Sequence, residues 1–148
     1  MNAAKKIITR IEADPKKKAA NAELSILRTA AYCRVSTDSS DQLESYKAQV
    51  AYYTDAIAKN PKRRFAGIYA DEGLSGTQAA KRDDFLRMIK DCEKGKIDYI
   101  ITKSVARFAR NTVDALKYVR KLKALGIGVY FEEQCLDSLK SESELALG

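Results

Sequence analysis

From Arg28 onward, the chain alternates between short runs of β-forming residues and longer stretches whose apolar residues recur every three or four positions. The β-rich runs predict strands at residues 29–34, 65–70, 97–102 and 127–131. The stretches between them predict three helices: one with apolar residues at Leu43, Tyr46, Val50, Tyr53 and Ile57, one over 83–94, and one that begins at Asn111 or Thr112 and ends at Gly126. Strands that alternate with helices are typical of βαβ units, so we expect an α/β fold with a mostly parallel sheet covered on both faces.

Capping and turn residues mark where these helices begin and end. Ser39 with Gln42 forms a capping box for the first helix, and the Asn60-Pro61 pair stops it. Gly95 closes the second helix, at a position that favours glycine. The segment 71–77 contains two glycines and is predicted to be a loop that follows the second strand.

The 148 residues include 27 Lys or Arg and 20 Asp or Glu, a formal net charge of +7, and 45% of them are hydrophobic. This fits one ordinary domain with a core of its own, which argues against a disordered tail or a disulfide-stapled miniprotein. No apolar run approaches the roughly 18 residues that a membrane span needs, and no secretory signal is present, so we expect a soluble cytoplasmic protein. Cys33, Cys92 and Cys135 are an odd, widely spaced set, which we interpret as small core residues rather than disulfides or zinc ligands.

The chain contains no histidine. This excludes Ser-His and Cys-His nucleophile pairs and metal sites with His ligands, so an enzyme built on this chain must activate its nucleophile in another way. The excess of positive charge favours a polyanionic partner such as nucleic acid. Residues 1–27 carry six Lys or Arg and three Asp or Glu. We interpret them as a mobile basic extension that either touches DNA phosphates or, the alternative we favour, is solvated.

Candidate chemistry gathers where the predicted strands end, because ligands of open α/β sheets bind beyond the carboxyl ends of the parallel strands. The residues concerned are Arg34 and Ser36 after the first strand, the 71–77 loop and Arg82 after the second, and Lys103, Ser104, Arg107 and Arg110 after the third. Arg107 and Arg110 are three apart, so one helical turn would place both on one face. Arginines bind phosphate oxygens in a bidentate manner, and a serine could act as nucleophile. The residues alone indicate an anion site. Each arginine taken singly fits a solvated or salt-bridged surface role better than a catalytic one, and Ser36 taken singly fits a helix cap or a turn.

Several motifs, in order, resemble the catalytic domain of the serine site-specific recombinases, the resolvase and invertase family. They are Tyr32-Cys33-Arg34-Val35-Ser36, the DEGLSG run at 71–76, Lys81-Arg82 and the stretch 104–111. The resemblance covers residues 28–137 and is strongest to the large serine recombinases and transposases. It implies a three-layer α/β fold and a nucleophile, Ser36, that attacks a DNA phosphodiester and forms a 5′-phosphoserine. The residues it implies for the phosphate are Arg34, Arg82, Arg107 and Arg110, with Gln49, Asp71 and Ser75 in support and Lys103 as a further candidate substrate contact.

The resemblance also implies what the reaction needs. The phosphoserine keeps the energy of the broken ester, so strand exchange and religation require no ATP, and the family uses no metal or other cofactor. The partner is DNA, and the full-length protein is expected to associate into dimers and tetramers. Family members continue into a long oligomerisation helix, and we predict that residues 138–148 are the start of it in a truncated chain.

One position departs from the family pattern. The small resolvases have an aspartate immediately before the first arginine of the R-x-x-R pair, and this chain has Ala106. The general base is therefore open among Asp71, Glu72 and the arginines.

Three alternatives remain beside the recombinase. A nucleotide-binding α/β module would need a glycine-rich loop such as GxGxxG or GxxxxGK[ST], and neither is present. A phosphoacceptor receiver domain would need paired acids after the first strand and an acceptor aspartate after the third. A catalytically silent DNA-binding protein on the same scaffold is disfavoured by the intact serine and arginines. Covalent capture of the protein on DNA separates the recombinase from all three.

Overall fold

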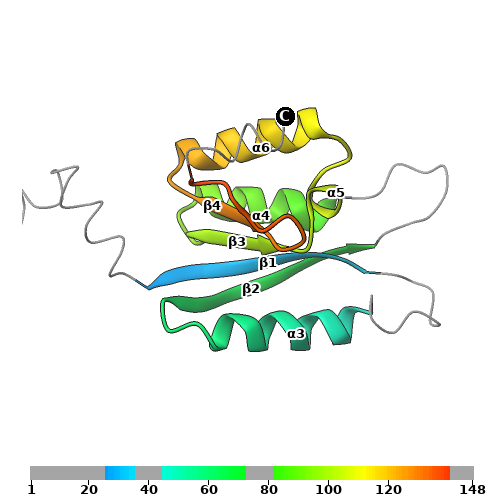
Figure 1. The fold of residues 1–148 in the computed structure, drawn as a ribbon, viewed down its shortest axis with the longest axis vertical. Helices are drawn as coiled ribbons and strands as arrows, with labels where there is room; N and C mark the ends of the chain where they lie inside the picture. The colour runs from blue at the N-terminus through cyan, green and yellow to red at the C-terminus, as the bar shows by residue number, and fades with distance from the viewer. Residues whose placement is uncertain (1–25, 36–44, 73–81, 141–148) are drawn as a thin grey trace, which may run out of the picture.

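The computed structural model describes residues 26–35, 45–72 and 82–140. From the first strand to the fourth, strands and helices alternate along the chain, and one short extra helix precedes the last long helix (Figure 1). Their bounds are β1 (Leu27–Val35), α3 (Tyr46–Ala58), β2 (Arg63–Glu72), α4 (Asp83–Glu93), β3 (Tyr99–Thr102), α5 (Val105–Phe108), α6 (Thr112–Ala124), β4 (Gly128–Phe131) and β5 (Leu136–Asp137).

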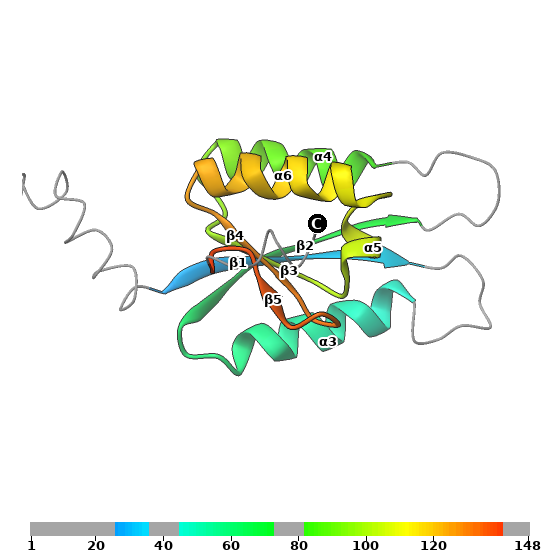
Figure 2. The ribbon, with the colours of Figure 1, turned by 45° about the horizontal axis from the view of Figure 1, so that its top comes forward.

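A five-stranded sheet in the order β2-β1-β3-β4-β5 forms the middle layer. The first four strands run parallel, and β5 pairs antiparallel with β4. Helix α3 covers one face of the sheet, and α4 and α6 cover the other (Figure 2). The predicted three-layer fold with a mostly parallel sheet is confirmed. The short strand β5 and the four-residue helix α5 were not predicted.

The two faces of the sheet are packed unequally. Between the sheet and α4 with α6 lies the larger hydrophobic cluster, where the Phe85 ring contacts the rings of Tyr32, Phe108 and Tyr118 edge-on at 4.9–5.1 Å between centroids. Such edge-on ring pairs add to the stabilisation from buried area. The cluster under α3 is smaller, and the buried residues of that helix are Gln49, Tyr53 and Ile57. The α3 face therefore has less apolar burial to hold its helix.

Several predicted boundaries need correction. Helix α3 begins at Tyr46 with Ser45 as its N-cap, whereas Ser39 and Gln42 lie outside the described residues. The second strand continues to Glu72, so Asp71 lies in a strand rather than in a loop. Strand β2 extends this far because it pairs with β1 up to Val35 and Glu72. The glycines that follow predict a turn and do not show where this pairing ends.

Two of the three cysteines behave as predicted. Cys33 and Cys92 are buried, and burial raises the pKa of the Cys92 thiol to about 12. The prediction for Cys135 was wrong: it is exposed, in the turn between β4 and β5, with a positive φ of 52°. Gly95 follows α4 with a φ of 77°, which confirms its predicted place at the helix end. No helix in the described part of the chain is long and apolar enough to cross a membrane.

Candidate active site at the carboxyl edge of the sheet

The backbone carbonyl of Arg34, near the end of β1, accepts hydrogen bonds from two side chains. Gln49 Nε2 of α3 donates to it at 2.9 Å, and Arg107 Nη1 of α5 donates at 3.2 Å. Pairing of β1 with β3 ends at Tyr32 and Thr102, so past that point side chains take over from the backbone ladder on this side of β1. Three residues that the sequence predicts for the site thus meet at one atom, two positions before Ser36.

Local capping places the two donors. The Ser45 side chain accepts from Ala48 N at 3.1 Å and starts α3 so that Gln49 lies buried in its first turn. Ser104 does the same for α5, where its Oγ accepts from Arg107 N at 3.2 Å. Ser104 is 4% exposed, and its hydroxyl serves as a helix cap.

Arg82 lies at the N-terminus of α4 with its guanidinium over the Phe85 ring, 3.8 Å from the ring centroid. The same group lies 5.5 Å from the centroid of Tyr32 and donates through Nη2 to the carbonyl oxygen of Phe108. Desolvation by burial lowers the pKa of Arg82. Its Nη1 is buried and has no hydrogen-bond partner among the described residues. A buried guanidinium with an unused donor is suited to an anionic ligand, because the ligand would satisfy both its charge and its N–H groups.

A pocket of about 260 Å³ opens beside Arg82. It is lined by Arg34, Arg82 and Arg110 together with Leu86, Ala109, Asp114 and Tyr118. Arg110 is 71% exposed and lies 3.9 Å from the carboxylate of Asp114. Guanidiniums converge on this pocket from a strand, a helix start and a connecting segment, an arrangement that suits an anionic ligand.

The predicted pairing of Arg107 and Arg110 on one helical face was wrong. Helix α5 ends at Phe108, and Ala109 is extended, with φ −149° and ψ 159°. Asn111 then caps α6 through its side chain, which accepts from Asp114 N. The two arginines therefore serve neighbouring places: Arg107 contacts the Arg34 carbonyl and Arg110 lines the pocket.

Of the remaining predicted site residues, one lies at the carboxyl edge of the sheet and the others lie outside the described residues. Lys103 directly follows β3, is partly exposed, and its backbone carbonyl accepts from Glu133 N at 2.8 Å. Ser36, Ser75 and Lys81 lie outside the described residues.

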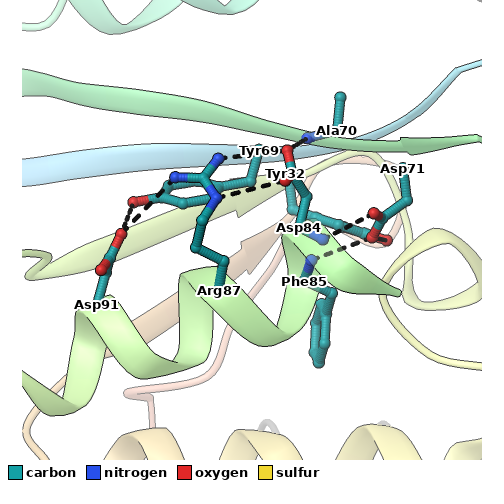
Figure 3. Close-up of polar contacts among 8 residues, drawn as sticks. All are labelled: Tyr32, Tyr69, Ala70, Asp71, Asp84, Phe85, Arg87 and Asp91. Carbon is teal, nitrogen blue, oxygen red and sulfur yellow. Dashed lines mark hydrogen bonds and ion pairs between the residues drawn. The ribbon is translucent and has the colours of Figure 1, made fainter. Parts of the chain in front are cut away.

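Asp71 is 7% exposed and uses its carboxylate to hold the start of α4 (Figure 3). Its oxygens accept from Tyr32 Oη at 2.7 Å, from Asp84 N at 2.9 Å and from Phe85 N at 3.0 Å. These two amides belong to the first turn of α4, where N–H groups lack helical partners. Burial, and then the bond to Asp71, raise the pKa of Tyr32. Asp71 is thus the capping side chain of the helix that begins beside Arg82.

Further polar contacts fasten α4 along β2. Asp84 accepts from Ala70 N at 2.9 Å, which reciprocates the bond from Asp84 N to Asp71. Two turns after Asp84, Asp91 accepts from Tyr69 Oη at 2.6 Å, and Arg87, one turn after Asp84, lies over the Tyr69 ring (Figure 3). Arg82 therefore lies at the start of a helix that is hydrogen-bonded to β2 through Asp84 in its first turn and through Asp91 two turns later.

Glu132 is a residue that sequence reasoning missed. It follows β4 and accepts from Tyr53 Oη at 2.7 Å and Tyr52 Oη at 2.9 Å, both from α3. Its place immediately after a predicted strand is a signal that could have marked it. Among the described residues no group of three or more His, Cys, Asp or Glu is arranged to hold a metal ion.

Comparison with known proteins gives matches over most of the chain. The family model described as the resolvase N-terminal domain matches residues 29–148. An uncharacterized protein of Sinorhizobium fredii, y4bA/y4pH, is 32% identical in an alignment 119 residues long that covers 71% of this chain and 17% of that protein. The chain therefore spans about a sixth of the length of the curated relative it matches.

Solved structures with the same fold include a resolvase family site-specific recombinase from Streptococcus pneumoniae, at 28% identity and a TM-score of 0.65 over 82% of this chain and 83% of that one. The N-terminal catalytic domain of TP901-1 integrase is 21% identical with a TM-score of 0.63, covering 81% of this chain and 88% of that one. The catalytic domain of ISC1926 TnpA, an IS607-like serine recombinase, is 16% identical with a TM-score of 0.58, over 72% and 69% of the two chains. At these lower identities the likeness concerns the fold.

Proposed function

The chain belongs to the resolvase N-terminal domain family, and on that premise we propose that it is the catalytic domain of a site-specific DNA recombinase whose nucleophile is Ser36. The observation that carries the proposal is the pocket formed by Arg34, Arg82 and Arg110. Arg107 and Gln49 fix the backbone of Arg34, two residues before that serine. A bound phosphodiester would find permanent positive charge on several sides.

The proposed reaction exchanges one ester for another. Ser36 Oγ attacks the scissile phosphorus, the bond from phosphorus to the 3′ oxygen breaks, and the leaving 3′ oxygen takes up a proton. The protein is then esterified to the 5′ end. In the second step the 3′ hydroxyl of a partner strand attacks this phosphoserine and returns the proton and the serine. Each step conserves one phosphate ester, so no external energy source enters the balance.

Within this proposal the candidate site residues divide into two groups. Arg34, Arg82 and Arg110 bind the phosphate oxygens, and Ser75 and Lys103 are further DNA contacts. Asp71 acts as a positioning residue, because its oxygens already accept from Tyr32 and from the first turn of α4. DNA is the partner, and self-association into dimers and tetramers belongs to a longer protein that contains this domain.

Covalent capture of DNA tests the proposal. The chain is incubated with a pool of duplexes that are randomised around a nick and labelled on the strand downstream of the break, and products are resolved on a denaturing gel. We expect a protein-linked 5′ end with the unaltered chain and none with Ser36→Ala, since alanine has no attacking oxygen. Ser40→Ala is the matched control and should keep the adduct.

Two results would contradict the assignment. An adduct that persists in Ser36→Ala would make another residue the nucleophile. DNA binding without any adduct from the unaltered chain would favour the catalytically silent DNA-binding protein.

A further inference from the structure

Glu132 holds two neighbouring phenols of α3 with one carboxylate. Its Oε1 accepts from Tyr53 at 2.7 Å and its Oε2 from Tyr52 at 2.9 Å, while the two rings meet edge-on with centroids 4.8 Å apart. Tyr53 is 3% exposed, whereas Tyr52 is 55% exposed. Burial, followed by the bond to Glu132, raises the pKa of Tyr53, so this phenol stays a proton donor at neutral pH. A charged acceptor makes the buried bond stronger than one between neutral groups.

Helix α3 packs on β1 and β2, and its buried positions combine an apolar side chain with polar ones. Ile57 is the fully aliphatic residue among its buried positions, and the other two, Gln49 and Tyr53, carry polar groups. Buried polar groups stabilise a helix only when their hydrogen bonds are made. The bond from Tyr53 to Glu132 satisfies one of these buried polar groups and links α3 to the residue that follows β4.

Gln49 and Tyr53 are four residues apart, so they lie on the same face of α3 one turn from each other. Glu132 holds Tyr53, and one turn earlier Gln49 Nε2 donates to the Arg34 carbonyl. If the first bond is lost, we expect the first turns of α3 to shift relative to β1 and Gln49 to shift with them.

We propose that Glu132 is a positioning residue, which fixes the Arg34 carbonyl through Tyr53 and Gln49 of α3. Its consequence for catalysis rests on the proposed recombinase function, whereas its effect on the Arg34 carbonyl does not. Arg107 donates to the same carbonyl from α5, so we expect loss of Glu132 to weaken the placement of this peptide rather than to abolish it.

The first experiment measures the Arg34 carbonyl directly. The carbonyl carbon chemical shift of Arg34 reports its hydrogen bonding, and amide hydrogen exchange over 46–58 reports the attachment of α3. We expect Tyr53→Phe and Glu132→Gln to move this shift and to speed exchange in α3 at least tenfold, with exchange in α6 unchanged. Tyr46→Phe removes an exposed phenol from the same helix and is the matched control.

A double-substitution cycle tests whether the effect passes through Gln49. Glu132→Gln should shift the Arg34 carbonyl in the unaltered chain and leave it unmoved when Gln49→Ala is already present. Equal effects in both backgrounds would overturn the proposal, because they would show that Glu132 acts on general stability. Thermal unfolding of each variant identifies any that fails to fold, and Tyr53→Phe, which removes one oxygen atom, then takes the place of Glu132→Gln in the cycle.

The rate of adduct formation tests the catalytic consequence. We expect Tyr53→Phe to slow it about tenfold, the factor that corresponds to one lost hydrogen bond of about 1.4 kcal/mol, with DNA affinity unchanged. A rate equal to that of Tyr46→Phe would refute this consequence. If the unaltered chain forms no adduct, the proposed function fails, and the Arg34 shift still decides the role of Glu132.

Discussion

Arg82 and Arg110 line the same pocket in different surroundings. Arg82 is partly buried, stacked on Phe85 and bonded to the Phe108 carbonyl, while Arg110 is 71% exposed and has Asp114 as its neighbour at 3.9 Å. A stacked, planar guanidinium cannot be replaced by an ammonium group, whereas an exposed charge often can. The two arginines should therefore tolerate lysine to different degrees.

We predict that Arg82→Ala slows adduct formation on the order of 10²- to 10³-fold, the scale for loss of a preorganised charge-stabilising donor. Arg82→Lys should recover little of this loss, and Arg110→Lys should keep most of the activity. Single-turnover adduct formation measures both. Arg64→Ala, at the exposed start of β2, is the control for loss of one positive charge. Equal rescue by lysine at both positions would show that only net charge matters in this pocket.

The sequence located the arginines at the correct edge but could not pair them. Arg107 and Arg110 look like neighbours on one helical turn, yet two capping residues, Ser104 and Asn111, divide the stretch into separate helices. The meeting of Gln49 with the Arg34 carbonyl depends on how α3 lies on the sheet. Periodicity gives the buried face of a helix and does not give the partner of a single polar group on it.

At the scale of elements, the turn between β4 and β5 contains a backbone angle that its residue does not favour. Cys135 has a φ of 52°, where a side chain with a Cβ costs roughly 1–2 kcal/mol relative to its usual conformations. Glycine has no such cost, although it loses more chain entropy on folding. This strain is not evident from the sequence, because the hydrophobicity of cysteine predicts burial.

We predict that Cys135→Gly is more stable than Cys135→Ala by about 1 kcal/mol, since both remove the thiol and only glycine relieves the backbone. Both variants lose the contact between Cys135 Sγ and the Glu132 carbonyl, so this loss cancels in the comparison. Urea unfolding followed by circular dichroism gives the two free energies. Equal stability would mean that the turn accepts a Cβ without strain.

Element boundaries show where sequence patterns stop being informative. The runs of β-forming residues predict the ends of β1 and β2 to within two residues, and glycine marks the end of α4. Asp71 was assigned to a loop because glycines follow it closely. In the structure it completes β2 and caps α4, which is a tertiary contact between two elements separated by the 73–81 segment.

At the scale of the whole molecule, the first and third strands are joined at their beginnings by one ion pair. Arg28 donates to Asp98 from its backbone N at 2.8 Å, from Nε at 2.9 Å and from Nη2 at 2.9 Å. These bonds hold the pKa of Asp98 below its usual value. The unfolded chain therefore takes up this proton at a higher pH than the folded protein does. The stabilisation is complete above the ordinary aspartate pKa and is lost as the pH falls through the lowered one.

We predict that Asp98→Asn lowers the free energy of unfolding at pH 7 by at most about 1 kcal/mol, because both side chains are partly exposed and solvent screens the pair. The difference from the unaltered chain should shrink as the pH falls from about 5 to about 2. Urea unfolding across this range measures it. Asp55→Asn, which disrupts the more exposed pair with Lys59, should produce a smaller change. A difference that stays constant with pH would contradict this account.

The layers of the fold were predictable, and the strand order was not. Alternating strands and helices require a parallel sheet with helices on its faces, whichever strand lies in the middle. The placement of β1 between β2 and β3, and the weaker cover of the α3 face, follow from packing among distant segments.

The position of β1 inside the sheet has a consequence for synthesis on the ribosome. Of the strands in this sheet, β1 is translated first. One of its two edges has no partner until β3 is made, and the residues that pair at the start of these two strands, Arg28 and Asp98, are 70 positions apart. Until then its amides and carbonyls on that side are open to pairing with other chains. The Arg34 carbonyl can receive Gln49 early in translation and must wait for Arg107. Translation therefore supplies the two donors to the Arg34 carbonyl in a fixed order, Gln49 before Arg107.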